Sequence, residues 1–200
     1  MSAARTRCPE DGPCVERAHQ PDDASIFARI AGGDLAALGL LYDRYQRDVR
    51  QFLVRAVGRA DADDVLHETF LLAARIAERY DGRTCARPFL IGIAAKRVRQ
   101  RRRSAARLAD GLRGLAEQVA RWARHTPEDA ASDTERMREF DLALARLSDD
   151  KRLVFLMIER EGMSGEQVSE ALGVPVATVW TRLHYARKEL RDALGRRDPS

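Results

Sequence analysis

The residues best suited to chemistry lie near the C-terminus, where cationic, aromatic and hydroxyl side chains recur along one expected helix. A guanidinium such as that of Arg182 donates paired hydrogen bonds to guanine, and an indole packs on a thymine methyl group or a sugar. Hydroxyl and imidazole groups bond to bases or phosphates. The pattern predicts duplex DNA contact through Thr178, Trp180, Thr181, Arg182, His184, Tyr185, Arg187 and Lys188.

A second cationic group is the run from Lys96 to Arg107, which contains seven basic residues and no acidic one. Tyr80 and Phe89 precede it in the sequence. Cations hold phosphates while aromatic rings stack on unpaired bases, at roughly 1–3 kcal/mol per base. The run predicts a site for single-stranded DNA, although a solvated face and a core position for Phe89 remain alternative interpretations.

The segment from Asp61 to Glu78 has the opposite charge, with five carboxylates against Arg75 alone. Such a surface suits a basic protein partner, because complementary charges steer association. We therefore expect one face of the molecule to bind DNA and another to bind protein.

The sequence contains no Ser/His/Asp set, no phosphate-binding loop and no metal-ligand spacing, so we expect no catalytic residue, cofactor or metal. Cys8, Cys14 and Cys85 lack a CxxC pattern and are expected to be free thiols. A redox- or metal-sensitive tail formed by Cys8, Cys14 and His19 stays a minor alternative. No apolar run reaches the ~20 residues of a membrane span, and no apolar leader opens the chain. We expect a cytoplasmic protein without membrane insertion.

The composition, 44% hydrophobic and 33% charged, predicts a globular all-α protein with two small helical domains joined by a flexible linker. We expect a disordered tail at 1–22 and a first domain at 23–107. A linker at 108–134 then leads to a second domain at 135–195, with a short tail at 196–200.

Local signals place the expected helix ends. Asp34 and Asp61 are expected N-caps, and Ser164 with Gln167 has the form of a capping box. Gly173 is expected to end one helix and, with Pro175, to lead directly into the next, a helix-turn-helix pattern. Its second helix should bury Val179, Leu183, Ala186 and Leu190.

These segments resemble the extracytoplasmic-function (ECF) type of RNA polymerase sigma factor in the sigma-70 family. The resemblance runs from about Ser25 to Leu194, apart from the linker, with region two in the first domain and region four in the second. It is strongest in DADDVLHETF (61–70), in the YDG turn (80–82) with PFLIGIA (88–94), and in GVPVATVWTRLHYAR (173–187).

The resemblance implies a sigma factor that binds core RNA polymerase, melts promoter DNA and has an anti-sigma factor as a further partner. It implies polymerase binding by Asp61, Asp63, Asp64, Glu68 and Phe70. It implies minus-ten DNA binding by Tyr80, Phe89, Lys96, Arg97 and Arg99. The outer face of the last helix would read the minus-thirty-five element through Thr178, Trp180, Thr181, Arg182, His184, Tyr185, Arg187 and Lys188.

The sequence departs from the family pattern at several positions, so we expect an altered promoter sequence. These positions are His67, Phe89, Ala95, Lys96, Gly165 and Trp180. Two other functions remain open. A stand-alone helix-turn-helix regulator would use only the second domain, and a helical adaptor or sigma-like decoy would not bind DNA.

Overall fold

The computed structural model describes residues 21–82, 85–111 and 135–195 of the 200-residue chain. The expected N-terminal tail up to residue 20, most of the expected linker and residues 196–200 lie outside the described residues, as do Cys8 and Cys14. The described residues form eight α-helices and no strand, and the predicted all-α class is confirmed.

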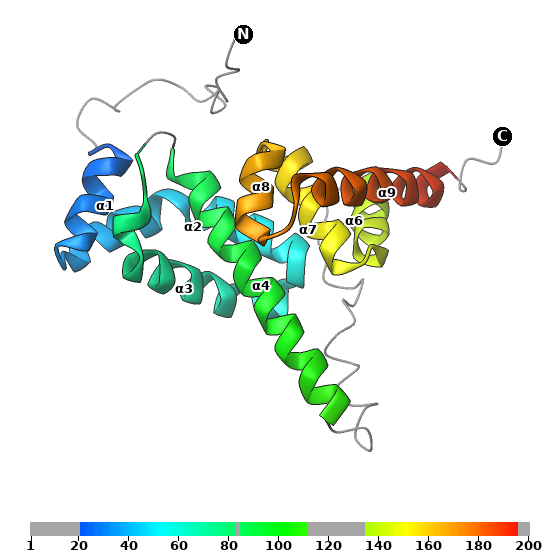
Figure 1. Ribbon diagram of the computed structural model, residues 1–200, viewed down its shortest axis with the longest axis horizontal. Coiled ribbons are helices and arrows are strands. Elements are labelled where there is room, and N and C mark those ends of the chain that lie inside the picture. The colour runs from blue at the N-terminus through cyan, green and yellow to red at the C-terminus, as the bar shows by residue number, and fades with distance from the viewer. Residues whose placement is uncertain (1–20, 83–84, 112–134, 196–200) are drawn as a thin grey trace, which may run out of the picture.

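The first half of the molecule, α1 to α4, packs four helices around one apolar core (Figure 1). Leu41, Phe52 and Leu90 lie at its centre and are fully buried. The C-terminal part of α4 extends away from the other helices and continues past residue 107, the expected end of the first domain. The elements are α1 (Asp23–Ala31), α2 (Leu35–Val57), α3 (Arg59–Arg75), a 3-10 turn η2 (Ala77–Arg79) and α4 (Ala86–Gly111).

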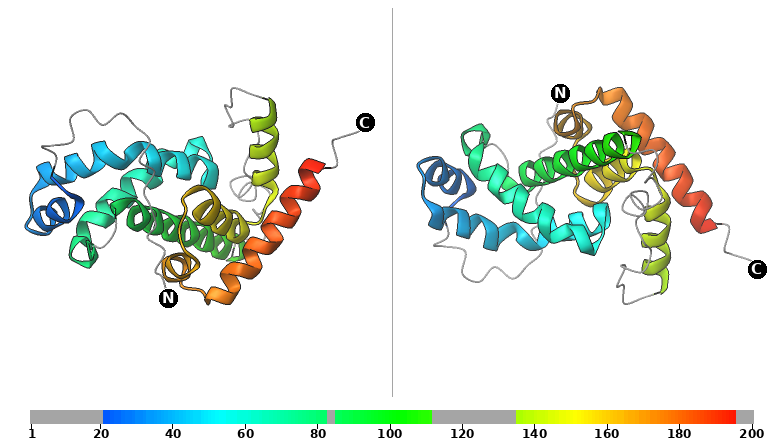
Figure 2. Two further views of the ribbon diagram at one scale, coloured as in Figure 1. Left: turned by 90° about the horizontal axis from the view of Figure 1, so that it is seen from above. Right: turned by 90° about the horizontal axis from the view of Figure 1, so that it is seen from below.

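The second half, α6 to α9, is a smaller helical unit. Helix α9 packs on α6, α7 and α8, and it runs along the outer edge of the molecule when seen from above (Figure 2). Helix α8 lies against α4, so the two halves are in contact (Figure 1). The elements are α6 (Glu135–Arg146), α7 (Asp149–Phe155), a π-helical turn η4 (Leu156–Arg160), α8 (Gly165–Leu172) and α9 (Val176–Gly195).

Most expected helix ends are confirmed. Asp34 accepts hydrogen bonds from the backbone nitrogens of the first turn of α2, and Ser164 forms a complete capping box with Gln167. The expected N-cap at Asp61 is wrong, because α3 already begins at Arg59. Gly58, with a φ of 90°, ends α2 and starts α3 at once, which places Asp61 inside the first turn.

Asp23 fastens α1 to the rest of the first half. Its carboxylate accepts hydrogen bonds from Arg44 Nη1 at 2.6 Å, from the Tyr45 hydroxyl and from the backbone nitrogen of Ala86 at 2.8 Å. Burial, together with the hydrogen bond to Asp23, raises the pKa of Tyr45. One side chain thus connects the starts of α1 and α4 to α2.

We predict that Asp23→Ala lowers the free energy of unfolding by about 2–3 kcal/mol, because three donors in a partly buried site lose a charged acceptor. Urea unfolding followed by circular dichroism measures the change. Asp43→Ala, at an exposed position of α2, is the matched control and should leave the unfolding midpoint almost unchanged. Equal effects of the two substitutions would contradict a role for Asp23 as a structural hub.

Candidate nucleic-acid interface

The helix-turn-helix of the second half has the predicted geometry. Gly173 adopts a left-handed conformation with a φ of 61° and ends α8, and Pro175 leads directly into α9. The inner face of α9 is confirmed, since its four predicted core residues are all buried: Val179, Leu183, Ala186 and Leu190. The opposite face of α9 is therefore turned toward solvent.

Six of the eight predicted DNA-contact residues are exposed on that outer face. Trp180 and Tyr185 keep 50% and 49% of their surface, so two large aromatic groups face solvent on one helix. His184 contacts the Tyr185 ring edge-on, and the Thr181 hydroxyl donates to the carbonyl of Ala177. The exposed residues are Trp180, Thr181, His184, Tyr185, Arg187 and Lys188.

Arg182 and Thr178 are only partly exposed, and Arg182 is already engaged. Its Nη2 donates to Asp150 Oδ2 on α7 at 2.5 Å, and its Nη1 is buried without a hydrogen-bond partner. Arg187 donates to Glu159 Oε1 at 2.8 Å through its Nε. Lys188 forms no ion pair within the described residues, so it is the cation of this set most accessible to a phosphate.

The predicted minus-ten cations on α4 differ in their accessibility. Lys96 is exposed, whereas Arg97 donates to Glu68 Oε2 through Nε and Nη2 at 3.0 and 2.5 Å. Arg99 donates to the carbonyl of Leu172, at the C-terminus of α8 in the other half. Arg97 is thus paired with the carboxylate of Glu68, and Arg99 lies 3.6 Å from that of Asp150.

The two predicted stacking residues, Tyr80 and Phe89, belong to one aromatic cluster with Phe27 of α1. The rings of Tyr80 and Phe27 are stacked with centroids 4.2 Å apart, and the ring of Phe89 meets Phe27 edge-on at 5.5 Å. Burial raises the pKa of Tyr80. Both rings keep part of their surface exposed, so they combine a core role with an accessible edge.

The acidic residues of α3 fall into two groups. Asp61 and Asp64 reach solvent and form no ion pair among the described residues. Asp63, by contrast, binds Arg50 at 2.7 Å, and this hydrogen bond lowers the pKa of its carboxyl. Hydrogen bonds from Arg101 and then Arg97 lower the pKa of Glu68 in the same way.

Two apolar residues of α3 differ from the sequence-based expectation. Phe70 is 3% exposed and its ring contacts Tyr42 at a centroid distance of 4.8 Å, so it supports the helix from inside the core. Leu71, which the sequence did not single out, is 61% exposed. It lies one turn after His67 on the outer face of α3. In the sequence it is distinguished only as an apolar residue that does not follow the helical spacing of the buried residues.

The two halves are joined by four ion pairs within the part of the chain that the structure describes, and all have the same polarity. The cations come from α2 and α4, and the carboxylates come from α6, from α7 and from the residue that follows η4. The pairs are Arg55–Asp141 (4.0 Å), Arg87–Glu161 (2.6 Å), Arg99–Asp150 (3.6 Å) and Arg102–Asp149.

This contact between the halves is incompletely hydrogen-bonded. Arg87 Nε, Asp141 Oδ1 and Glu161 Oε2 are buried without a well-aligned hydrogen bond, although Arg87 Nε lies 3.1 Å from Asp48 Oδ2 and Glu161 Oε2 lies 2.6 Å from Arg87 Nη2. Burial raises the pKa of Asp141 and of Glu161. Imperfectly satisfied buried charges contribute little net stability, so the ion pairs alone add little to the packing of the two halves.

A buried arginine completes the contact. Arg152 of α7 donates to the carbonyls of Leu144, Ala145 and Leu147 and also to that of Ala56 at the end of α2. Burial lowers the pKa of Arg152 to about 10. These bonds satisfy carbonyls near the C-termini of α6 and α2, where the helix dipole favours a cation.

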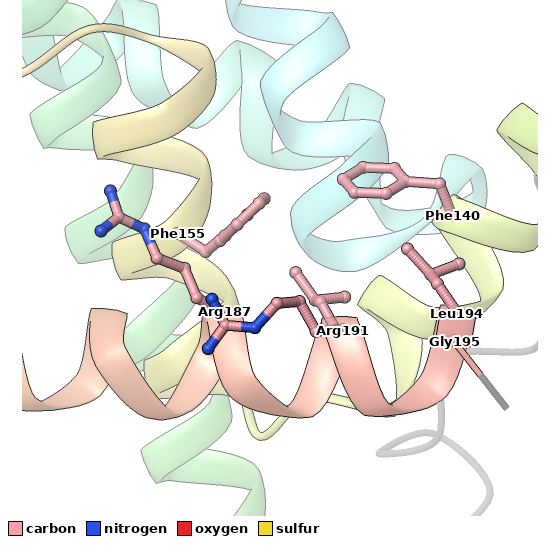
Figure 3. Close-up of a pocket in the computed structure, with 7 residues that line it drawn as sticks. Phe140, Phe155, Arg187, Arg191, Leu194 and Gly195 are labelled. Atoms are coloured by element: carbon pink, nitrogen blue, oxygen red, sulfur yellow. The ribbon is translucent and has the colours of Figure 1, made fainter.

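The surface of the second half also carries a pocket of about 490 Å³ between α6, α7 and α9. Figure 3 shows Phe140, Phe155 and Leu194 around it, with Arg187 and Arg191 at its edge. Its described lining is apolar apart from the two arginines. Within the described residues, no His, Cys, Asp or Glu cluster is arranged for a metal, and no helix could cross a bilayer.

Comparisons with known proteins match both halves of the chain. Residues 41–108 match the family model "Sigma-70 region 2", and residues 137–190 match "Sigma-70, region 4". The ECF RNA polymerase sigma factor SigL of Mycobacterium tuberculosis is 33% identical over 82% of this chain and 94% of its own. The ECF RNA polymerase sigma-E factor of Haemophilus influenzae is 29% identical over 88% of this chain and 97% of its own.

Two solved structures are similar to this fold. CnrH in complex with the cytosolic domain of CnrY aligns with a TM-score of 0.58 and 25% identity over 88% of this chain and 99% of that chain. The sigma factor RpoE from Bartonella quintana, in complex with the anti-sigma factor NepR, aligns with a TM-score of 0.62 over 80% of this chain and 98% of that chain. Its 19% identity supports the fold alone.

Proposed function

The chain belongs to the sigma-70 family of RNA polymerase sigma factors, as a member of the ECF group, and from this premise we propose how its surfaces divide the work of transcription initiation. The observation that carries the proposal is that matches to regions 2 and 4 occur in order on one chain, with α3 and most of α4 in the first and α8 and most of α9 in the second. A stand-alone regulator would need only region 4, and that alternative is not favoured. Sigma factors are initiation factors, and the polymerase performs the chemistry.

Core polymerase binds to the outer face of α3. Asp61 and Asp64 are accessible and unpaired within the described residues, and Leu71 supplies an exposed apolar group on the same helix. An apolar anchor among charges is typical of a protein interface, in which complementary charge orients the partners. Asp63 and Glu68 lie at the edge of this face with their arginine partners. Phe70 is buried in the core and holds α3 in position.

Promoter DNA binds to α4 and α9. Lys96 and the partly exposed edges of Tyr80 and Phe89 lie on the first half and suit an unpaired minus-ten strand. The exposed face of α9 suits duplex DNA in the major groove, with Lys188 on a phosphate and the aromatic and hydroxyl groups toward bases.

The two halves separate when the factor acts. We call the structure described here, in which the two halves are in contact, the closed arrangement. In it Arg99 and Arg102 face carboxylates of α7, and Asp150 also binds Arg182. DNA phosphates would compete for the same guanidinium groups, and polymerase binding would supply the free energy to release them. Separation also frees the face of α4 that α8 covers.

An anti-sigma factor is the expected inhibitor. CnrH was solved in complex with the cytosolic domain of CnrY, and the Bartonella RpoE in complex with the anti-sigma factor NepR. We propose a protein partner of this kind for the present chain. A protein that binds both halves would stabilise the closed arrangement by linkage. With DNA and polymerase as partners, we propose that the chain acts in the cytoplasm.

Co-elution with bacterial core RNA polymerase on a sizing column tests the proposal. We expect a stoichiometric complex at moderate salt that weakens at high salt, because opposite charges make the interface. Duplex binding without any association with polymerase, in the absence of an inhibitor protein, would favour a stand-alone regulator instead.

A further inference from the structure

Trp180 lies directly over Gly165, so α9 and α8 touch through an indole ring. A Cβ atom built on Gly165 would lie 2.6 Å from Cζ2, 3.0 Å from Cε2 and 3.2 Å from Nε1 of that ring. Carbon atoms in favourable contact are about 3.5–4.0 Å apart. The indole therefore occupies the space that any side chain at position 165 would need.

The backbone at position 165 is held more firmly than the ring. Ser164 and Gln167 exchange hydrogen bonds of 2.8 and 3.2 Å in the capping box, and Val168 anchors α8 in the core. Trp180 is half exposed, so one side of its ring borders solvent and no other side chain needs to move if the ring is displaced to that side. A methyl group at position 165 would consequently displace the indole and leave α8 in place.

The exposed half of the indole belongs to an apolar strip at the start of α9. Val176, one turn before Trp180, is 37% exposed, and Ala177 is exposed beside it. In the major groove the apolar group on a base edge is the 5-methyl of thymine. A ring held against Gly165 presents a fixed surface to such a methyl group.

We propose that Gly165 determines promoter specificity by positioning the Trp180 indole against the 5-methyl group of one thymine in the upstream promoter element. This inference rests on the proposed function, because it requires α9 to lie in the major groove. Trp180 contacts the base, and Gly165 acts through Trp180.

The test uses holoenzyme assembled from core polymerase and the full chain. Selection from duplexes with a randomised upstream element first defines the preferred site, and each thymine is then replaced by deoxyuridine, which lacks the methyl group. We expect wild-type affinity to fall about three- to fivefold at one position, the effect of one buried methyl group. Gly165→Ala and Trp180→Ala should both lose this discrimination, and the double variant should match Trp180→Ala.

Two controls separate positioning from a general defect. Gly39→Ala adds a methyl group in open space on α2 and should keep wild-type discrimination. With Trp122→Phe, Trp180 is the only tryptophan of the chain, and its fluorescence should shift to longer wavelength in Gly165→Ala while the unfolding midpoint stays close to that of the parent.

The possible outcomes distinguish this inference from the proposed function. If wild-type holoenzyme selects no sequence, the proposed function fails. If it selects a site but no thymine methyl matters, or if Gly165→Ala keeps both the discrimination and the emission wavelength, the role of Gly165 is overturned.

Discussion

Joining α4 to α8 by a disulfide between Gly92→Cys and Ala171→Cys is expected to abolish promoter-dependent transcription until a reductant is added. A Cβ on Gly92 would lie 3.3 Å from Cβ of Ala171, close to the roughly 3.8 Å of a disulfide. Such a bond favours the closed arrangement by about 3 kcal/mol or more, which is over a hundredfold in population. Arg99 and Arg102 would stay bound to α7 and unavailable to DNA.

The experiment needs a background in which Cys8, Cys14 and Cys85 are serine, so that only the new pair can react. Run-off transcription is measured before and after reduction, and a non-reducing gel quantifies the cross-linked fraction. Each single-cysteine variant, treated with the same oxidant, is the matched control and should remain active. Full activity of the cross-linked protein would show that the two halves need not separate.

Reversing the accessible charges of α3 is expected to weaken the complex with core polymerase roughly ten- to a hundredfold at moderate salt. The double variant Asp61→Lys, Asp64→Lys removes two unpaired carboxylates and places two cations against a basic partner. Fluorescence titration of labelled chain with core polymerase measures the affinity. Leu71→Ser should weaken the same complex without changing its salt dependence, because it removes apolar contact only.

The control for charge reversal carries the same change of charge elsewhere. Asp43→Lys with Asp192→Lys alters two exposed carboxylates outside α3 and should keep near wild-type affinity. Because Asp61 lies in the first turn of α3, circular dichroism must show that each variant is folded. Equal affinities of the two double variants would contradict a polymerase-binding face on α3.

Local sequence patterns predicted the elements of this fold. The repeat of Val179, Leu183, Ala186 and Leu190 at spacings of three and four determines which face of α9 is buried, because a helix places those positions on one stripe. Gly173 marked the end of α8 because few other residues adopt a positive φ. The remaining positions of α9 were therefore predicted to form its exposed face.

The pairing of charges across the chain was not predictable. Asp149 and Asp150 carry the pattern of a helix N-terminus in the sequence, and nothing local indicates that they bind Arg99, Arg102 and Arg182. Those contacts depend on how the two halves pack.

The packing of aromatic rings was likewise outside the reach of sequence patterns. Phe70 and Trp180 are both aromatic residues of helices, and the sequence predicted a partner-binding role for each. Phe70 is buried in the core, however, whereas Trp180 is half exposed and covers Gly165. Only the three-dimensional arrangement decides which ring is available to a partner.

Promoter-specific run-off transcription tests the central claim most directly. Genomic fragments selected by the holoenzyme are transcribed by core polymerase with and without the chain, and the 5′ ends of the transcripts are mapped. We predict discrete start sites that arise only when the chain is present and that share upstream sequence elements. Identical transcripts from core polymerase alone, or repression of transcripts by the chain, would contradict its action as a sigma factor.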